Sequence, residues 1–457
     1  MGSLTTSLLI GVQALEASQA ALTATSNNIA NSNTPGYTRE EAQFSESPLT
    51  VQNSAVAGGG VMLNGIESVR DELLNLQIQQ QTSQQSSADT VSSSLQSVQT
   101  LFASNGSDIA SAFSSLSSSL AALSANPTDS STQQSVLTAG QNLAQAFNST
   151  ANGLTTSQSA ADQQVTQTVA QINSLTKQIA QLNTQLSSTV MSQQNGGTVE
   201  DQRDQLVQQL STLTGISVSQ SSDGEVITTA NGSPLVMGGQ SYNLQTTTGA
   251  NGFQQVLDAN GNNITSNIQG GQLGGAIQVR DQIVPGLLTS LNTLASQFAT
   301  AFNTAQKAGF DSTGAAGQAF FTVPANGAAS GISVALTSGS QVAISSDGSA
   351  GSNGNVANLS AALTNALPSG QTPANTYANL VYQVGSAVSN ASAQSTSLGQ
   401  SILQLTNQQS SVSGVNIDEE TTNLIRYQTA YEAAARVVST IQALSTVTLD
   451  MGSTQSY

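Results

Sequence analysis

Apolar residues recur at helical spacing at both ends of this chain, and these two patterns limit its fold more than any other feature. Near the N-terminus the residues that return every seven positions are Leu8, Leu15, Leu22 and Ile29. Near the C-terminus a second stripe comprises Leu424, Tyr427, Tyr431, Ala434, Val438 and Ile441. Stripes of this kind form where helices pack along a seam. We therefore expect a long helix at each end and expect the two helices to pair.

The first predicted helix is followed at once by turn-forming residues. Pro35 has no amide hydrogen and disfavours helical backbone in the residue before it, and Pro35-Gly36 suits the centre of a type II turn. Asn31 and Asn33 tolerate the dihedral angles found at helix ends. The helix is therefore predicted to end near residue 31 and the chain to turn sharply.

The last predicted helix has a clear start. Asn416 is placed to cap it, Glu419 occupies the third helical position, and acidic residues fill the first turn. A functional site at these acidic residues is the alternative, but capping explains them without one.

The middle of the chain is predicted to be mostly helical. The helices expected from apolar spacing cover residues 66–103, 107–125, 130–150, 165–190, 273–308 and 373–411. Residues 310–370 are rich in loop-forming residues instead. Such helices predict a central bundle.

One segment of the middle has the pattern of β-structure. Residues 216–270 alternate β-forming residues with Asp-Gly, Asn-Gly and Gly-Gly pairs, which is typical of a small antiparallel β domain. Within it, residues 258–263 (DANGNN) resemble part of a calcium-binding loop, but the glycine and the bidentate glutamate of such a loop are missing. We predict a hairpin turn there.

These elements combine into an elongated, nested multidomain chain that is mainly α with a small β insert. Paired N- and C-terminal helices are expected beside a central helical-bundle domain and a small antiparallel β domain. The expected domains are an N-terminal helix and extended loop (1–57) paired with a C-terminal helix (412–457), a helical domain in two parts (58–215 and 271–411), and a β-rich outer domain (216–270).

The composition excludes many kinds of chemistry. The chain has no Cys and no His, which removes thiol nucleophiles, histidine-dependent triads and the usual zinc sites. Lys177 and Lys307 do not follow glycine, so there is no phosphate-binding loop. We therefore expect no enzyme activity, no cofactor and no metal.

The net charge and the N-terminal sequence exclude further classes of partner and location. The net charge of -17 argues against nucleic acid as a partner. The N-terminus lacks the basic and long apolar segments of a signal peptide or a membrane span, so no membrane insertion is expected.

Two terminal segments resemble a known family. Residues 21–40, ALTATSNNIANSNTPGYTRE, resemble the N-terminal signature of the bacterial flagellar rod, hook and hook-associated axial proteins. Residues 410–451, which include SGVNIDEE and NLIRYQTAYEAA, and residues 309–321, GFDSTGAAGQAFF, resemble the hook-associated branch of that family. The family signature turn comprises Asn28, Asn31, Asn33, Thr34, Pro35, Gly36 and Tyr37.

This resemblance implies a structural subunit that forms a ring between the flagellar hook and the filament. The two apolar stripes then become its assembly interface, and the implied partners are further copies, the hook protein, the next hook-associated protein and the filament. Members of the family leave the cell unfolded through the type III channel, so a secreted, extracellular location is implied, as is a cytoplasmic export chaperone at the C-terminal helix. The alternatives are a hook or distal rod protein and, from another class, a secreted adhesin or surface-binding module.

Overall fold

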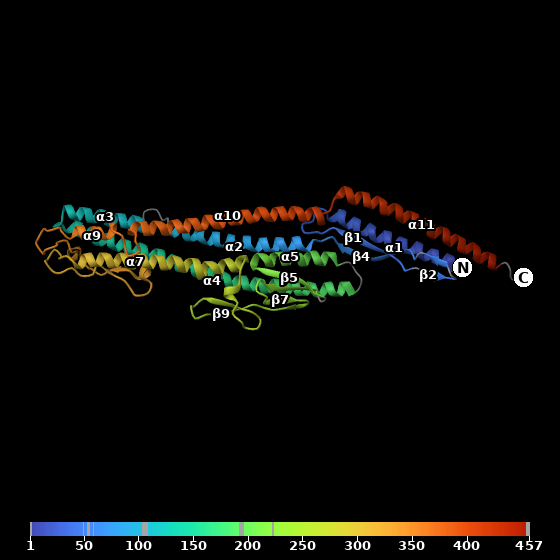
Figure 1. The fold of residues 1–457 in the computed structure, drawn as a ribbon, viewed down its shortest axis with the longest axis horizontal. Coiled ribbons are helices and arrows are strands. Elements are labelled where there is room, and N and C mark those ends of the chain that lie inside the picture. Colours follow the sequence, from blue (N-terminus) through green and yellow to red (C-terminus); the bar gives the residue numbers. More distant parts are fainter. Residues whose placement is uncertain are drawn as a thin grey trace.

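The computed structural model describes residues 2–48, 50–52, 55–57, 59–102, 108–191, 196–221 and 224–453. The molecule is a long, mainly helical rod with both termini at one end (Figure 1). Its principal helices are α1 (Gly2–Asn31), α2 (Glu72–Phe102), α3 (Ile109–Ala125), α4 (Ser130–Met191), α5 (Gly197–Leu213), α6 (Gly271–Gln278), α7 (Val284–Lys307), α9 (Val356–Thr364), α10 (Pro373–Ser413) and α11 (Ile417–Ser453).

The strands form small antiparallel sheets. They are β1 (Glu40–Glu46), β2 (Thr50–Gln52), β3 (Ala55–Ala57), β4 (Val61–Ser68), β5 (Ile216–Ser221), β6 (Gly224–Thr229), β7 (Pro234–Met237), β8 (Gln240–Ser241), β9 (Gln245–Thr248), β10 (Gln254–Leu257), β11 (Phe321–Thr322) and β12 (Ser333–Val334). The predicted fold class, an elongated and mainly α chain with a small β insert and paired terminal helices, is confirmed.

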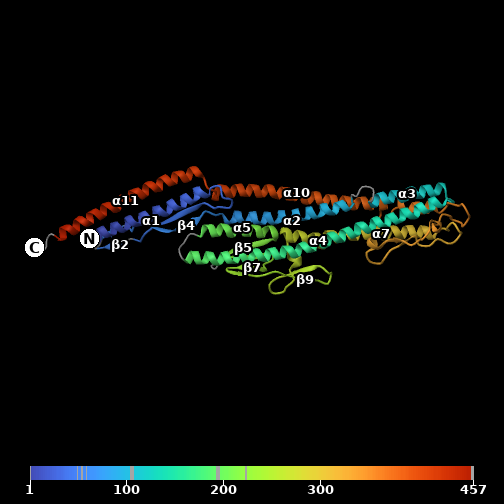
Figure 2. The same cartoon turned by 180° about the vertical axis from the view of Figure 1, so that it is seen from behind.

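The two ends of the chain form one terminal unit. Helices α1 and α11 run antiparallel side by side, and the β1–β4 hairpin also packs on α1, as both views show (Figures 1 and 2). The predicted turn is present: the Tyr37 N–H donates to the Thr34 carbonyl over 3.2 Å, and Gly36 has a φ of 79°. The α11 cap is confirmed as well, since the Asn416 side chain accepts the Asp418 N–H at 3.0 Å.

A first hydrophobic core fills the far half of the rod. It gathers buried side chains from α2, α3, α4, α7, α9 and α10, with the loops of 310–370 packed on it. Phe113, Phe298 and Phe302 lie at its centre, and the Phe113 and Phe298 rings meet edge to face with centroids 5.0 Å apart.

A second core joins the β domain to the helices. The four-stranded sheet β5-β6-β7-β8 and the β9–β10 hairpin pack on α4, and α5 and α6 complete the core. The predicted turn at 258–263 is confirmed, because the Asp258 carboxylate accepts the backbone N–H groups of Asn260 and Asn262 at 2.9 and 2.8 Å. Part of the predicted β domain, residues 222–223, lies outside the described residues.

The predicted helix bounds are wrong in two places. Residues 66–68 belong to β4, and the helix that follows begins at Glu72, because pairing with β1 holds this segment extended. The helices expected at 130–150 and 165–190 are one helix, α4. Gly153 does not interrupt it; a Cβ there would come within 2.7 Å of the Leu101 side chain, so glycine permits close packing of α2 on α4. Residue 103, the predicted end of α2, lies outside the described residues, as does Gly58 of the glycine run before β4.

A π-helical turn, Val279–Ile283, links α6 to α7 just ahead of Pro285. The wider turn lets the helix continue past a residue that cannot donate a backbone hydrogen bond. It also carries Arg280, whose side chain is fully buried.

Arg280 connects three segments. Its guanidinium donates to the Asp162 carboxylate of α4 at 2.8 Å, to the Gln254 carbonyl of β10 at 2.6 Å and to Asp281 at 2.7 Å. A buried cation held by a satisfied network therefore lies where the two cores meet, which sequence inspection did not identify.

Candidate assembly surface and its joint

The ten residues of the two predicted stripes, here called the terminal seam, lie on α1 and α11. Nine are half-buried and Tyr431 is just exposed, so none is fully covered within one chain. Gly11 lies against Val438: a Cβ on Gly11 would come within 2.8 Å of a Val438 methyl group. In the antiparallel register set by this contact, Leu15 lies at the level of Ala434 and Leu22 at the level of Tyr427.

The fully buried face of α1 is a different one. Apart from Gly11, which faces Val438, the buried residues of α1 are small or polar, namely Ala17, Ala21, Ala24, Thr25 and Asn28. Small residues permit close approach of the β1–β4 hairpin, where Ala42 is buried too. Sequence reasoning missed this face, although alanines three and four residues apart were the signal for it.

Many large apolar side chains of α11 are exposed. The large apolar side chains exposed along this helix are Ile417, Ile425, Tyr431, Val437, Leu444, Val447, Leu449 and Met451. A single chain therefore leaves much apolar surface of α11 uncovered.

The signature turn is fixed by a buried asparagine. The Asn28 carboxamide oxygen accepts the Tyr37 hydroxyl at 2.9 Å and the Glu40 N–H at 2.8 Å, while its amide donates to the Glu40 carbonyl. Thr34 is tied to Asn31 through its backbone N–H and its hydroxyl. Asn28 thus locks β1 to the end of α1.

The tip of the turn is exposed and reaches the middle of the chain. Asn33, Thr34, Pro35 and Gly36 are exposed, and the Pro35 carbonyl accepts the Gln205 side-chain amide at 3.2 Å. The structure therefore splits the predicted signature residues into a buried anchor and an exposed tip that touches α5.

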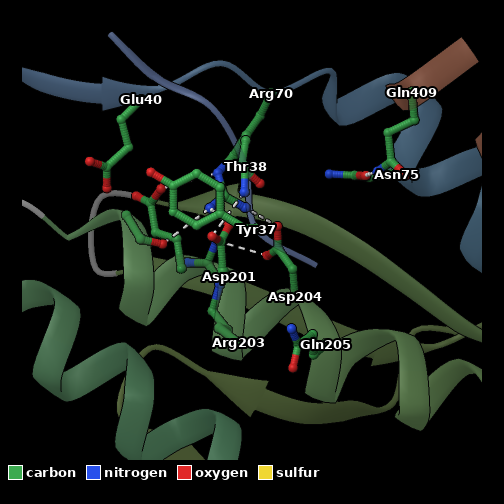
Figure 3. A network of polar contacts seen from close by, with 12 residues as sticks. Tyr37, Thr38, Glu40, Arg70, Asn75, Asp201, Arg203, Asp204, Gln205 and Gln409 are labelled. Carbon is green, nitrogen blue, oxygen red and sulfur yellow. Dashed lines mark hydrogen bonds and ion pairs between the residues drawn. The ribbon is translucent and has the colours of Figure 1, made fainter. Parts of the chain in front are cut away.

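A polar network joins the terminal unit to α5 (Figure 3). Arg70, in the linker between β4 and α2, forms ion pairs with Glu200 at 3.2 Å, with Asp201 at 2.5 Å and with Asp204. Asp201 also accepts the Thr38 N–H at 3.1 Å. These contacts, here called the joint, bridge residues more than 120 positions apart, so no local pattern in the sequence could reveal them.

The last connection of the joint involves α11. Arg39 pairs with Glu419 at 3.6 Å, and its N–H donates to the Ser413 carbonyl at 2.9 Å. A cavity of about 300 Å³ lies at the joint, lined by Tyr37, Arg70 and the end of α10. Both connections between the terminal unit and the rest of the rod, at residues 69–71 and 414–416, thereby lie at the joint.

Burial shapes the electrostatics of the joint. It raises the pKa of the Asp201 carboxyl, while the Thr38 N–H and the Arg70 guanidinium act in the opposite direction. Burial, with the nearby carboxylates of Glu40, Asp201 and Glu420, also raises the pKa of the Tyr37 hydroxyl. Tyr37 therefore remains a neutral hydrogen-bond donor, and the joint acts to fix orientation.

A buried ion pair connects α5 to strand β6 of the β domain. Arg203 and Glu225 are 2.8 Å apart, and both side chains are almost fully buried. Burial raises the pKa of Glu225 to about 7, although Arg203 lowers it.

We predict that this glutamate makes stability fall between pH 5 and pH 8. Its pKa is higher in the folded chain than its ordinary value of 4.5, so its contribution is fully present below pH 4.5 and lost as pH rises through about 7. Thermal melting of the parent and of Glu225→Gln should show a steeper decline for the parent over this range. Parallel pH profiles would contradict the prediction.

The described helices include none that is long and apolar enough to cross a membrane. Within the same residues, no group of three or more His, Cys, Asp or Glu side chains is arranged to hold a metal ion. The features that stand out are an apolar seam and a polar joint.

Comparison with known proteins agrees with the terminal motifs. Residues 95–321 match the flagellar hook-associated protein FlgK helical domain. Residues 8–38 match the flagella basal body rod protein family, and residues 407–451 match the C-terminal family of the flagellar basal body rod FlgEFG proteins.

Relatives that this chain matches over almost their whole length belong to the same family. The chain is 30% identical to flagellar hook-associated protein 1 of Bacillus subtilis, over 95% of this chain and 96% of the relative. It is 27% identical to flagellar hook-associated protein 1 of Escherichia coli, over 94% and 96%. The fold is similar to that of the flagellar hook junction protein FlgK from Burkholderia pseudomallei, with a TM-score of 0.66 and 19% identity over 74% of this chain and all of that one. The chain belongs to the flagellar hook-associated protein 1 family.

Proposed function

We propose that the chain is a structural subunit of the bacterial flagellum that forms the junction between hook and filament and is required for filament growth. The observation that carries this proposal is the terminal seam, which stays half-buried in one chain beside an exposed apolar face of α11. Surfaces of this kind are covered when copies associate. The family membership supports the location at the hook.

The partners follow from that role. Copies of the chain form a ring, which contacts the hook protein on one side and the next hook-associated protein and the filament on the other. An export chaperone covers the C-terminal helix in the cytoplasm, and the exposed apolar side chains of α11 supply a reason for it. The mature subunit is secreted and extracellular.

We also propose a division into three units. The β1–β4 hairpin crosses the predicted boundary at residue 57, so the terminal unit extends to residue 68 and resumes at residue 414. The second core spans residues 165–277, so the outer unit includes part of α4, α5 and α6 in addition to the β segment. The remaining residues form the helical unit around the first core.

The proposed role is structural and involves no turnover. The polar side chains of the joint are engaged with one another, and their arrangement serves to hold the terminal unit on α5. An adhesin, by contrast, gains nothing from two apolar helices paired at one end of the rod.

Labelled electron microscopy tests the proposal. A short epitope inserted after Asn251, in the exposed turn between β9 and β10, leaves both cores and the terminal unit untouched. Gold-conjugated antibody on purified flagella is expected at one narrow band where hook and filament meet. Label along the hook, along the filament or only on the cell body would contradict the proposal.

A further inference from the structure

The outer surface of the β1–β4 hairpin brings two carboxylates together. Glu41 and Glu67 are directly opposite each other on the paired strands, and both are exposed. Like charges in this arrangement destabilise a hairpin. Within the described residues neither forms an ion pair with a cation. Phe44 and Leu63, also opposite each other and exposed, lie beyond the register shift between Gln43 and Phe44, so the pair of carboxylates forms an acidic surface at one end of the paired strands.

The exposed side of α11 carries positively charged side chains instead. Of the eight cationic residues of the chain, four form ion pairs in the described part, namely Arg39, Arg70, Arg203 and Arg280. Of the other four, Arg426 and Arg436 both lie on α11, are exposed and pair with no carboxylate in the described part. Arg426 contacts only the neighbouring Tyr427 within the described part: it donates to the Tyr427 hydroxyl at 2.9 Å, and its guanidinium lies 4.8 Å from the ring centre.

The two arginines lie on one side of the helix. They are separated by ten residues, close to three helical turns. Ile425 and Val437, exposed by 60% and 51%, flank them, whereas the seam residues lie on the other side. Glu432 is also exposed in this stretch, so the surface carries two cations and one carboxylate.

These two surfaces lie on different sides of α1. Helix α11 approaches α1 at Gly11, whereas the hairpin approaches it at Ile10 and Gln13 through Gly60, and at Asn28 through Glu40. Figure 1 shows α1 between α11 and the strands. The cationic surface and the acidic surface are therefore directed toward different neighbours.

We infer that the exposed face of α11 docks on the β1–β4 hairpin of a second copy of this chain, with Arg426 and Arg436 facing Glu41 and Glu67. The charges are complementary, and exposed Ile425 and Val437 beside the arginines of α11 add apolar area to the contact. Because each copy uses two different surfaces, the contact is head-to-tail, and repeating it generates a ring or an open helix. The inference rests on the proposed self-assembly and adds the orientation of neighbouring copies.

A charge-swap series tests the inference in cells that lack the native chain. Arg426→Glu with Arg436→Glu, and Glu41→Arg with Glu67→Arg, should each lower filament number about tenfold or more. The chain carrying all four changes should restore it to within about twofold of the parent, since opposite charges face each other again. Lys177→Glu with Lys307→Glu, at exposed sites outside the terminal unit, is the matched control and should leave filament number unchanged.

A second measurement uses the absence of cysteine. Glu67→Cys is combined with Arg426→Cys in one chain and with Arg436→Cys in another, and purified flagella are oxidised. At least one chain should form covalent multimers on a non-reducing gel, whereas Glu67→Cys with Lys177→Cys should not.

The outcomes separate this inference from the proposed function. Parental filament number in either double variant, or no multimers from both cysteine chains, overturns the docking arrangement. The docking arrangement is also overturned if the chain with all four changes is secreted and folded but builds no more filaments than the two double variants. Val438→Asp, which places a carboxylate in the terminal seam, tests self-assembly independently of these charges. If the results above occur while Val438→Asp still blocks filament assembly, the self-assembly role stands and only the orientation of neighbouring copies is wrong. If the parent chain restores no filaments, the proposed function itself fails, and this inference with it.

Discussion

Cells whose only copy of the chain carries Val438→Asp are expected to secrete it and yet to build almost no filaments. Val438 lies against Gly11 in the terminal seam and is half-buried in one chain, so the proposed association of copies would bury a carboxylate at this position. Burying an unpaired charge costs about 2 to 5 kcal/mol unless the group protonates. The cost recurs in every copy of the ring, so filament number should fall about a hundredfold.

The same change should leave the rest of the chain folded. Neither hydrophobic core contains a residue of α1 or α11. Thermal melting of the purified variant should therefore follow that of the parent. Leu22→Asp, on the facing helix, should behave in the same way, whereas Gln428→Asp, at an exposed polar position of α11, should assemble normally.

The measurements are melting temperature, secreted amount and filament number for each variant. A large loss of melting temperature in Val438→Asp would mean that the terminal helices belong to an ordinary core. Normal filaments would mean that the seam has no part in assembly. Filament subunits released into the medium are the expected sign of a missing junction.

Arg280→Met is expected to produce a large loss of stability at the boundary between the helical unit and the outer unit, because Arg280 ties Asp162 of α4 to β10 of the outer unit. It leaves the Asp162 carboxylate and the Gln254 carbonyl without their strongest donor, inside a packed region. Removing one member of a buried ion pair costs about 3 to 5 kcal/mol. The midpoint of denaturant unfolding for this unit should move accordingly, and amides of β9 and β10 should exchange faster.

The control for this prediction is a double-mutant cycle. Asp162→Asn removes the charge and keeps an oxygen that can accept the Gln254 N–H, which Asp162 now accepts at 2.8 Å. Combined with Arg280→Met, it should cost clearly less than the sum of the two single changes. Lys307→Met removes an exposed cation from the end of the same helical stretch and should shift stability by about 0.5 kcal/mol or less. Additive effects in the cycle would show that Arg280 acts only through packing.

The local features of the fold were readable from the sequence. The end of α1 follows from Pro35 and Gly36, the start of α11 from Asn416, and the turn at Asp258 from its Asn-Gly pair. In each case a residue and its neighbours determine backbone geometry, so no distant part of the chain is needed. The spacing of the seam residues likewise placed them on one face of each helix.

Other features depended on segments far away in the chain. Residues 66–68 have a helical pattern but form β4, because β1 supplies paired backbone groups 24 to 28 positions earlier. Gly153 sits inside α4 because α2 packs against it. Propensity is a weak influence that a single tertiary contact of this kind can reverse.

What the sequence determined by itself is the set of helices, their apolar faces and the turn that ends α1. What only the tertiary structure decided is which charges meet. Arg70 pairs with Asp201 and Arg280 with Asp162 across more than a hundred residues, and Glu41 faces Glu67 because of a hairpin register. Helical periodicity is a property of neighbouring residues, whereas an ion pair requires two groups to be close in space, and only the packed chain brings them together.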